Sequence, residues 1–158
     1  MNVFYLDECP RQAAACLVDK HVVKMPIECA QLLSTAHRML DGTDEIDGIT
    51  LYKATHKNHP SAIWARSSLK NYQWLFDHYV SICCEYNARY GKNHKSGNLR
   101  WALAFAPKSI PVNSFEPPPQ VMPDQYKSNN TISSYRSYYK SEKGHIAKWS
   151  NTNRPQWF

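Results

Sequence analysis

The sequence contains only five glycines in 158 residues, and none lies in a Gly-rich run of the kind that cradles nucleotide phosphates. It has no uninterrupted apolar stretch near the roughly 18–20 residues that a transmembrane helix needs. Its five cysteines form neither a Cys-x-x-Cys pair nor any other metal-finger spacing. These absences argue against a P-loop enzyme, a membrane-spanning protein and a zinc-finger protein.

The start of the chain does not resemble a secretory signal. The first residues, Met-Asn-Val-Phe-Tyr-Leu-Asp-Glu, contain no basic segment and no long apolar segment. The odd number of cysteines fits reduced thiols, so we expect a cytoplasmic protein. The length of 158 residues predicts one domain, residues 1–158, with its own apolar core.

Positive charge is concentrated in the second part of the chain. Residues 1–90 contain nine Lys or Arg and ten Asp or Glu, a net charge of −1, whereas residues 91–158 contain ten and three, a net charge of +7. Tyrosines and tryptophans are interleaved with these basic residues. Cations that meet phosphates beside rings that stack on bases are typical of a nucleic-acid surface. The alternative is a solvated basic face with half-buried tyrosines.

The spacing of apolar residues predicts an all-α fold, a few packed helices with long irregular connections and no β-hairpin. Pro26 lies inside the clearest helical pattern and is expected to kink or restart that helix. Six prolines between residues 107 and 123 predict an extended segment that wraps the domain or links it to the basic, aromatic region 124–158. The expected helices cover residues 7–18, capped by Asp7, then 19–40, 60–91, 98–105 and 131–143.

A polar stripe follows one side of the expected helix 19–40. Its members recur at steps of three and four residues, which places them on one face of a helix. An imidazole, an ammonium group and a carboxylate within two turns form a plausible acid–base site, and an exposed face with ordinary spaced charge pairs is the alternative. The stripe consists of His21, Lys24, Glu28, Gln31, Thr35 and Arg38.

Two segments resemble a known family. Residues 17–21 read Leu-Val-Asp-Lys-His, Glu28 follows the histidine by seven residues, and residues 154–158 read Arg-Pro-Gln-Trp-Phe. This pattern is similar to that of the phage pyrimidine-dimer DNA glycosylases of the endonuclease V type. Those small helical enzymes have a Leu-Ala-Asp-Gln-His run, a catalytic glutamate at the same spacing, and a late Arg-Pro-x-Trp-aromatic element.

The resemblance implies a DNA-repair glycosylase, with or without AP-lyase activity, that acts on a flipped base in duplex DNA without a cofactor. Such enzymes attack the sugar C1′ with an amine and cut the backbone by β-elimination through a Schiff base. Glu28 would stabilise the cationic sugar, and His21 would contact the DNA near the lesion. Arg154 and Trp157 would bind the substrate. A phage origin would place the protein in the cytoplasm of an infected host cell.

The chain departs from the family at the nucleophile. The family uses the α-amine of a threonine that is exposed when the initiator methionine is removed. Here the large residue Asn2 follows Met1, so we expect Met1 to stay and its own α-amine to be one candidate nucleophile. Lys24 is the other. Two phosphate-binding arginines of the family correspond to Ile27 and Gln31, so Lys24 and Arg38 would have to replace them.

The loop before residue 60 is dense in hydrogen-bonding side chains. Tyr52, Lys53, His56 and His59 precede a helix N-terminus, which favours contacts to phosphates or bases. Two histidines three residues apart are a weak metal signal, and we expect no metal. A loop held by its own hydrogen bonds is the third interpretation. Further substrate contacts are expected from Arg66 and Asn71 in the next helix.

The sequence thus predicts a DNA glycosylase centred on Glu28 and His21. Two other hypotheses fit the same composition. One is a phage protein that binds nucleic acid or a nucleotide without catalysis, using the same cleft. The other is an interaction protein, such as a small inhibitor, whose basic C-terminal region binds an acidic protein partner.

Overall fold

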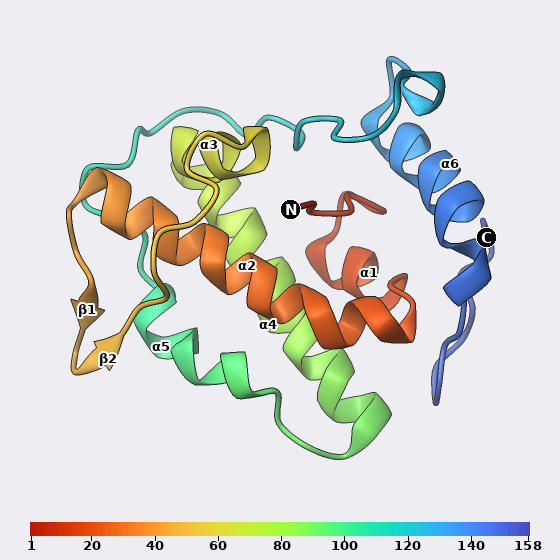
Figure 1. The fold of residues 1–158 in the computed structure, drawn as a ribbon, viewed down its shortest axis with the longest axis horizontal. Helices are drawn as coiled ribbons and strands as arrows, with labels where there is room; N and C mark the ends of the chain where they lie inside the picture. Colours follow the sequence, from red (N-terminus) through yellow and green to blue (C-terminus); the bar gives the residue numbers. More distant parts are fainter.

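Two long helices form the centre of the structure. The computed structural model describes residues 1–158, and in it α2 (Asp19–Leu40) and α4 (Leu69–Tyr90) pack side by side, as Figure 1 shows. Their facing sides are fully buried, with Leu33 and Tyr79 among the largest core side chains. The predicted all-α fold is therefore confirmed. The other helices are α1 (Pro10–Ala15), α3 (Pro60–Ser67), α5 (Arg100–Leu103) and α6 (Thr131–Lys143), with 3₁₀ turns at Lys95–Leu99, Asp124–Tyr126 and Gly144–Ile146.

Pro26 does not end α2, so the helix does not restart there. The helix continues through it over 22 residues. A proline removes one backbone donor, but the ring of Pro26 is buried in the core. Burial of the apolar ring offsets the missing hydrogen bond. The polar stripe of α2 is consequently carried by one continuous helix, as its spacing requires.

The predicted helix over residues 60–91 is in fact two helices. Ser68 separates α3 from α4, with extended backbone angles of φ −154° and ψ 140°. Its hydroxyl oxygen accepts a hydrogen bond from the amide of Lys70 at 3.2 Å and so caps α4. A serine hydroxyl can compete for backbone groups in this way, which favours a helix boundary over a helix interior.

The first helix is shorter than predicted. It ends at Ala15 instead of residue 18, and its N-cap is Cys9. The expected cap, Asp7, instead accepts a hydrogen bond from the Cys9 amide at 3.0 Å, just outside the helix. The helix expected at residues 98–105 comprises the 3₁₀ turn Lys95–Leu99 followed by α5.

A small β-hairpin follows α2, so the prediction of none was wrong. β1 (Glu45–Ile46) and β2 (Ile49–Thr50) pair in antiparallel fashion. Asp47 and Gly48 between them have φ of 50° and 77°, and positive φ at both positions is what a two-residue hairpin turn demands. An Asp-Gly pair is the sequence signal for such a turn, although strands of two residues leave no alternating pattern to read.

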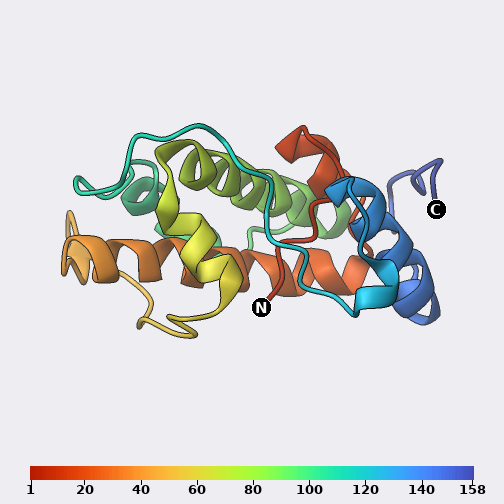
Figure 2. The same cartoon turned by 90° about the horizontal axis from the view of Figure 1, so that it is seen from above.

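Residues 107–123 run in extended form from α5 to α6, across α3 and α4 (Figure 2). Hydrogen bonds to α3, α4 and α6 hold this segment in place. Its Pro111 carbonyl accepts from the Leu69 amide at 2.8 Å, and its Glu116 carbonyl accepts from Trp64 Nε1 at 2.7 Å. Near its end, the Pro119 carbonyl accepts from Tyr135 of α6 at 2.6 Å. These bonds position α6.

The N-terminal and C-terminal regions of the chain pack together where α2 begins. Arg136 of α6 donates through Nε to the Leu6 carbonyl at 2.8 Å, and the Asp19 amide donates to the Lys148 carbonyl at 2.8 Å. The N-terminal segment is thereby enclosed between α2 and α6. None of the helices combines the length and apolarity needed to cross a bilayer.

Candidate active site

Glu28 lies at the centre of the polar stripe on α2. Its Oε1 is 2.8 Å from Nζ of Lys24, one helical turn earlier, and its Oε2 accepts from the backbone amide of Asn2 at 3.4 Å. The Glu28 side chain keeps 14% of its surface exposed, whereas Lys24 keeps 66%. The structure therefore brings the start of the chain against a half-buried carboxylate that solvent still reaches.

The N-terminal segment is held firmly in this position. The Asn2 side chain accepts from the Phe4 amide and donates to the Val121 carbonyl, both at 3.0 Å. Phe4 has φ of 53°, a left-handed conformation that is uncommon for a bulky residue. Val3 and Leu6 on either side are fully buried. Burial of these residues fixes the course of the chain and with it the approach of residue 2 to Glu28.

His21 lies two turns before Glu28 on α2 and is 8% exposed. Its ring stacks on Phe4 with centroids 4.5 Å apart, and its Nδ1 is 2.7 Å from the hydroxyl of Tyr139 on α6. The pKa of His21 is lowered to about 4, mainly by burial and also by the charges of Lys143 and Lys24, which together outweigh the opposing effect of Glu28. At neutral pH the imidazole is therefore uncharged.

The loop that leads into α3 lies on the other side of the N-terminus (Figure 1). His59 caps α3, with Nδ1 accepting from the Ser61 amide at 3.1 Å. Burial lowers the pKa of His59, and the positive charges of the N-terminal amine and of His56 add to the effect. His56 is exposed and bonds to Thr55 at 2.7 Å.

Other members of the predicted site bind within the protein. Thr35 is buried and accepts from the Thr55 amide at 3.2 Å. Arg38 donates to the carbonyls of Tyr52 at 2.8 Å and Leu51 at 3.0 Å. The hydroxyl of Tyr52 is 3.0 Å from Ser96 Oγ. In this structure these side chains hold the loop that follows the hairpin, and Gln31 lies half-buried among them on α2.

The remaining predicted residues differ in their accessibility. Lys53 and Arg154 are exposed, and Arg66 is partly exposed and donates to the Lys57 carbonyl at 2.8 Å. Trp157 packs edge-on against Tyr139. The guanidinium carbon of Arg136 lies 5.1 Å from the centroid of the Trp157 ring, in a cation–π contact. Asn71 is fully buried.

Asn71 lies apart from the loop and from Glu28. Its amide group donates to the Trp64 carbonyl at 3.1 Å, and its oxygen accepts from the Glu116 amide at 3.0 Å. Both hydrogen bonds lie at the interface of α3, α4 and the proline-rich segment. The structure thus gathers His21, Lys24, Glu28, Met1 and His59 around one area and leaves Asn71 elsewhere.

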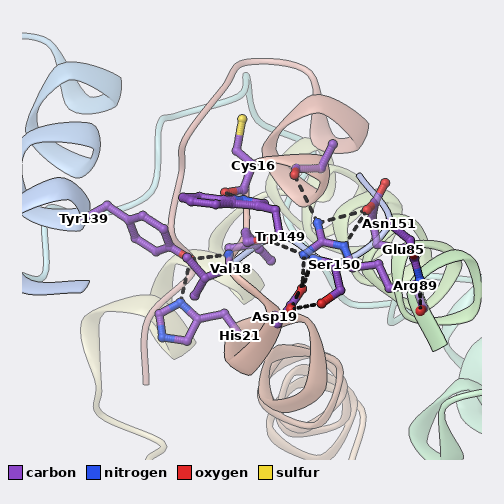
Figure 3. Close-up of polar contacts among 12 residues, drawn as sticks. Cys16, Val18, Asp19, His21, Glu85, Arg89, Tyr139, Trp149, Ser150 and Asn151 are labelled. Carbon is purple, nitrogen blue, oxygen red and sulfur yellow. Dashed lines mark hydrogen bonds and ion pairs between the residues drawn. The ribbon is translucent and has the colours of Figure 1, made fainter. Parts of the chain in front are cut away.

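A buried ion cluster at the start of α2 was not predicted (Figure 3). The guanidinium of Arg89 is completely buried, pairs with Asp19 at 3.1 Å and Glu85 at 3.0 Å, and donates to the Leu17 carbonyl at 2.8 Å. Ser150 Oγ donates to Asp19 at 2.7 Å. This cluster fixes the turn that precedes His21 and joins the C-terminal tail to it.

Two hollows of the surface lie away from Glu28. One, of about 630 Å³, is lined by α4 and the turn and helix over residues 93–101. The other, of about 640 Å³, lies between the first half of α4 and residues 104–112. Neither includes a residue of the α2 stripe. No group of three or more His, Cys, Asp or Glu side chains is arranged to hold a metal ion.

The structure thus places His21, Lys24 and Glu28 on one face of α2, with the Glu28 carboxylate still reached by solvent. A family model described as pyrimidine dimer DNA glycosylase matches residues 1–98, which is more than half of the chain. The protein therefore belongs to the pyrimidine dimer DNA glycosylase family. No curated protein and no solved structure matches the chain. The matched residues include His21, Lys24 and Glu28.

Proposed function

We propose that this protein excises pyrimidine dimers from duplex DNA with its N-terminal α-amine as nucleophile, and then cuts the strand as an AP lyase. The observation that carries the proposal is the 3.4 Å contact between the Asn2 amide and the Glu28 carboxylate, because it places the N-terminus beside the one accessible carboxylate of the α2 stripe. The family assignment supplies the pyrimidine-dimer substrate.

The proposed reaction begins with attack on C1′ of the damaged nucleotide. A bond forms from the amine nitrogen to C1′ while the glycosidic bond breaks and its electron pair leaves with the pyrimidine. The nitrogen loses a proton, the sugar ring opens, and an imine remains. Removal of a C2′ proton then expels the 3′-phosphate and cleaves the strand. Glu28 stabilises the cationic sugar and exchanges these protons.

The amine of Met1 is a better nucleophile than Lys24 in this arrangement. Lys24 is two-thirds exposed and its ammonium group is paired with Glu28, whereas nucleophilic lysines are typically desolvated. The Met1 residue is half-buried, and the amide of the next residue, Asn2, lies 3.4 Å from the Glu28 carboxylate.

The DNA is proposed to lie across the face that contains the N-terminus. In both Figures 1 and 2 the loop before α3 and helix α6 stand on opposite sides of that terminus. Lys53 and His56 on the loop, and Arg154 on the tail, are exposed cations or imidazoles available to phosphates. The C1′ atom of a stacked nucleotide is not accessible, so the target must rotate out of the duplex to reach Glu28.

The test is borohydride trapping with duplex DNA that carries one thymine dimer. The wild-type protein should give a covalent adduct that mass spectrometry assigns to the N-terminal residue, together with strand cleavage. Glu28→Gln, which keeps the size of the side chain and removes its charge, should lower cleavage by about 10²–10⁴-fold. Salt-sensitive binding to the same DNA should persist in this variant.

Several outcomes would contradict the proposal. An adduct on Lys24 would keep the reaction and reject the N-terminal nucleophile. Binding without adduct or cleavage in the wild-type protein would favour a DNA-binding protein that lacks catalysis. Equal cleavage by Glu28→Gln would remove Glu28 from the reaction.

A further inference from the structure

Helix α6 contributes a buried tyrosine to the surroundings of His21, although α6 lies outside the residues that match the family model. Tyr139 has no exposed surface, and its hydroxyl meets the turn between α1 and α2. It accepts a hydrogen bond from the Val18 amide at 3.0 Å and lies 2.7 Å from Nδ1 of His21 (Figure 3). These two contacts define the hydrogen-bonding state of the histidine.

The hydroxyl of Tyr139 has a single proton to give. Because the Val18 amide already donates to the oxygen, and no other acceptor is within hydrogen-bonding distance, that proton goes to Nδ1 of His21. A donor at Nδ1 requires this nitrogen to be unprotonated. In a neutral imidazole the ring proton must then be on Nε2.

Nε2 of His21 is free for a partner from outside the protein. No protein group bonds to it, and it is not among the buried polar atoms that lack a partner, so solvent reaches it. In Figure 3 this nitrogen points away from the other residues drawn. It therefore offers one N–H donor on the face of α2 that also carries Glu28, two turns away.

We propose that Tyr139 is a positioning residue for the DNA reaction, which fixes His21 as the Nε2–H tautomer and so presents a single N–H donor to the DNA on the same face of α2 as Glu28. The inference rests on the proposed function, since it assumes that DNA occupies this face. The donor would meet a phosphate or sugar oxygen of the damaged strand. A neutral donor there binds the oxygen without adding another full charge next to the carboxylate.

Three aromatic side chains pack around the ring of Tyr139. Its ring lies edge-on to Phe4, with centroids 5.2 Å apart, and edge-on to Trp157 and Phe158 at 6.4 and 6.5 Å. Phe4 in turn stacks on the His21 ring. The C-terminal aromatic residues thus act on His21 through Tyr139, independently of any contact that they make with DNA.

The tautomer can be observed directly by two-dimensional NMR of the full-length protein labelled with ¹⁵N-histidine. At pH 7 the His21 ring should show the Nε2–H pattern. Tyr139→Phe removes only the hydroxyl and should convert this pattern into a mixture of tautomers. Tyr135→Phe is the matched control, because Tyr135 is an equally buried tyrosine of α6 whose hydroxyl donates to the Pro119 carbonyl. It should leave the His21 signals unchanged.

Cleavage of dimer-containing DNA provides the functional readout. Tyr139→Phe should lower the rate about tenfold, the loss expected when one orienting buried hydrogen bond is removed, and Tyr135→Phe should not. His21→Gln can place an amide N–H near the Nε2 position, whereas the shorter His21→Asn cannot. We expect His21→Gln to be at least tenfold more active, and this comparison also serves if Tyr139→Phe fails to fold.

The inference is overturned if wild-type His21 carries its proton on Nδ1 or is charged at pH 7. An unchanged tautomer in Tyr139→Phe, or equal activity of His21→Gln and His21→Asn, has the same consequence. If the wild-type protein shows the Nε2–H tautomer but cleaves no dimer-containing DNA, the proposed function fails while the Tyr139–His21 hydrogen bond stands. The two failures are thus distinguishable.

Discussion

Helix α2 carries two carboxylates with basic partners, and their surroundings differ sharply. Asp19 pairs with Arg89, whose five N–H donors are all used within the protein, and it also accepts from Ser150. Glu28 has one exposed lysine at 2.8 Å and one long amide contact at 3.4 Å. A carboxylate whose partners are complete serves the fold, whereas Glu28 retains acceptor capacity for a substrate.

The two pairs also differ in whether sequence spacing predicts them. Glu28 and Lys24 are four residues apart, so their contact follows from helix geometry. Asp19 and Arg89 are 70 residues apart and meet only because α2 and α4 pack together. Replacing the basic partner in each pair by methionine would show whether the pairs differ as strongly in energy as in burial.

Arg89→Met should have the largest effect on stability, about 3–5 kcal/mol. The substitution leaves the carboxylates of Asp19 and Glu85 without their shared cation and the Leu17 carbonyl without its donor. Urea unfolding monitored by circular dichroism measures the loss. A change below about 1 kcal/mol would show that water replaces the guanidinium readily. The cluster would then contribute little to holding the turn before His21.

Asp19→Asn should cost less, about 1–3 kcal/mol at pH 7. Burial raises the pKa of Asp19, but hydrogen bonds from Ser150 and the charge of Arg89 outweigh it, so the pKa is lowered overall. The ionised form is therefore favoured by folding. An asparagine amide also presents donors where the Ser150 amide and hydroxyl already donate.

The pH dependence of this variant follows from the direction of the shift. The contribution of Asp19 is complete above its unfolded pKa of about 3.9 and is lost as pH falls through the lower folded value. The stability difference between wild type and Asp19→Asn should therefore shrink between pH 5 and pH 2. A constant difference over that range would mean that ionisation of Asp19 does not stabilise the fold.

The sequence predicted those helices whose apolar repeat and end signals lie within a single segment. α2 and α6 were predicted with the bounds that the structure shows, because each has a 3.6-residue repeat and clear ends. The same helix geometry placed His21, Lys24 and Glu28 on one face. The break at Ser68 was missed because the apolar pattern continues across it.

The rest of the site depends on contacts between distant segments. The Asn2 amide reaches Glu28 across 26 residues, and Tyr139 reaches His21 across 118, so no spacing rule connects them. Arg38 and Asn71 have the polar side chains expected of a binding site, yet both bond to protein carbonyls in this fold. Whether a polar side chain turns outward or inward is decided by tertiary packing.

The smallest stability effect is expected for Lys24→Met, no more than about 0.5 kcal/mol, because the Lys24 side chain is 66% exposed and pairs with Glu28 four residues along the same helix. The stability of Lys24→Met is to be compared with that of Arg89→Met, which is the same type of replacement in a buried pair.

The Lys24→Met variant should still form a borohydride-trapped adduct at the N-terminus. Loss of one phosphate-binding cation should reduce the salt slope of DNA binding by about one. Complete loss of the adduct in a folded Lys24→Met protein would instead identify Lys24 as the nucleophile.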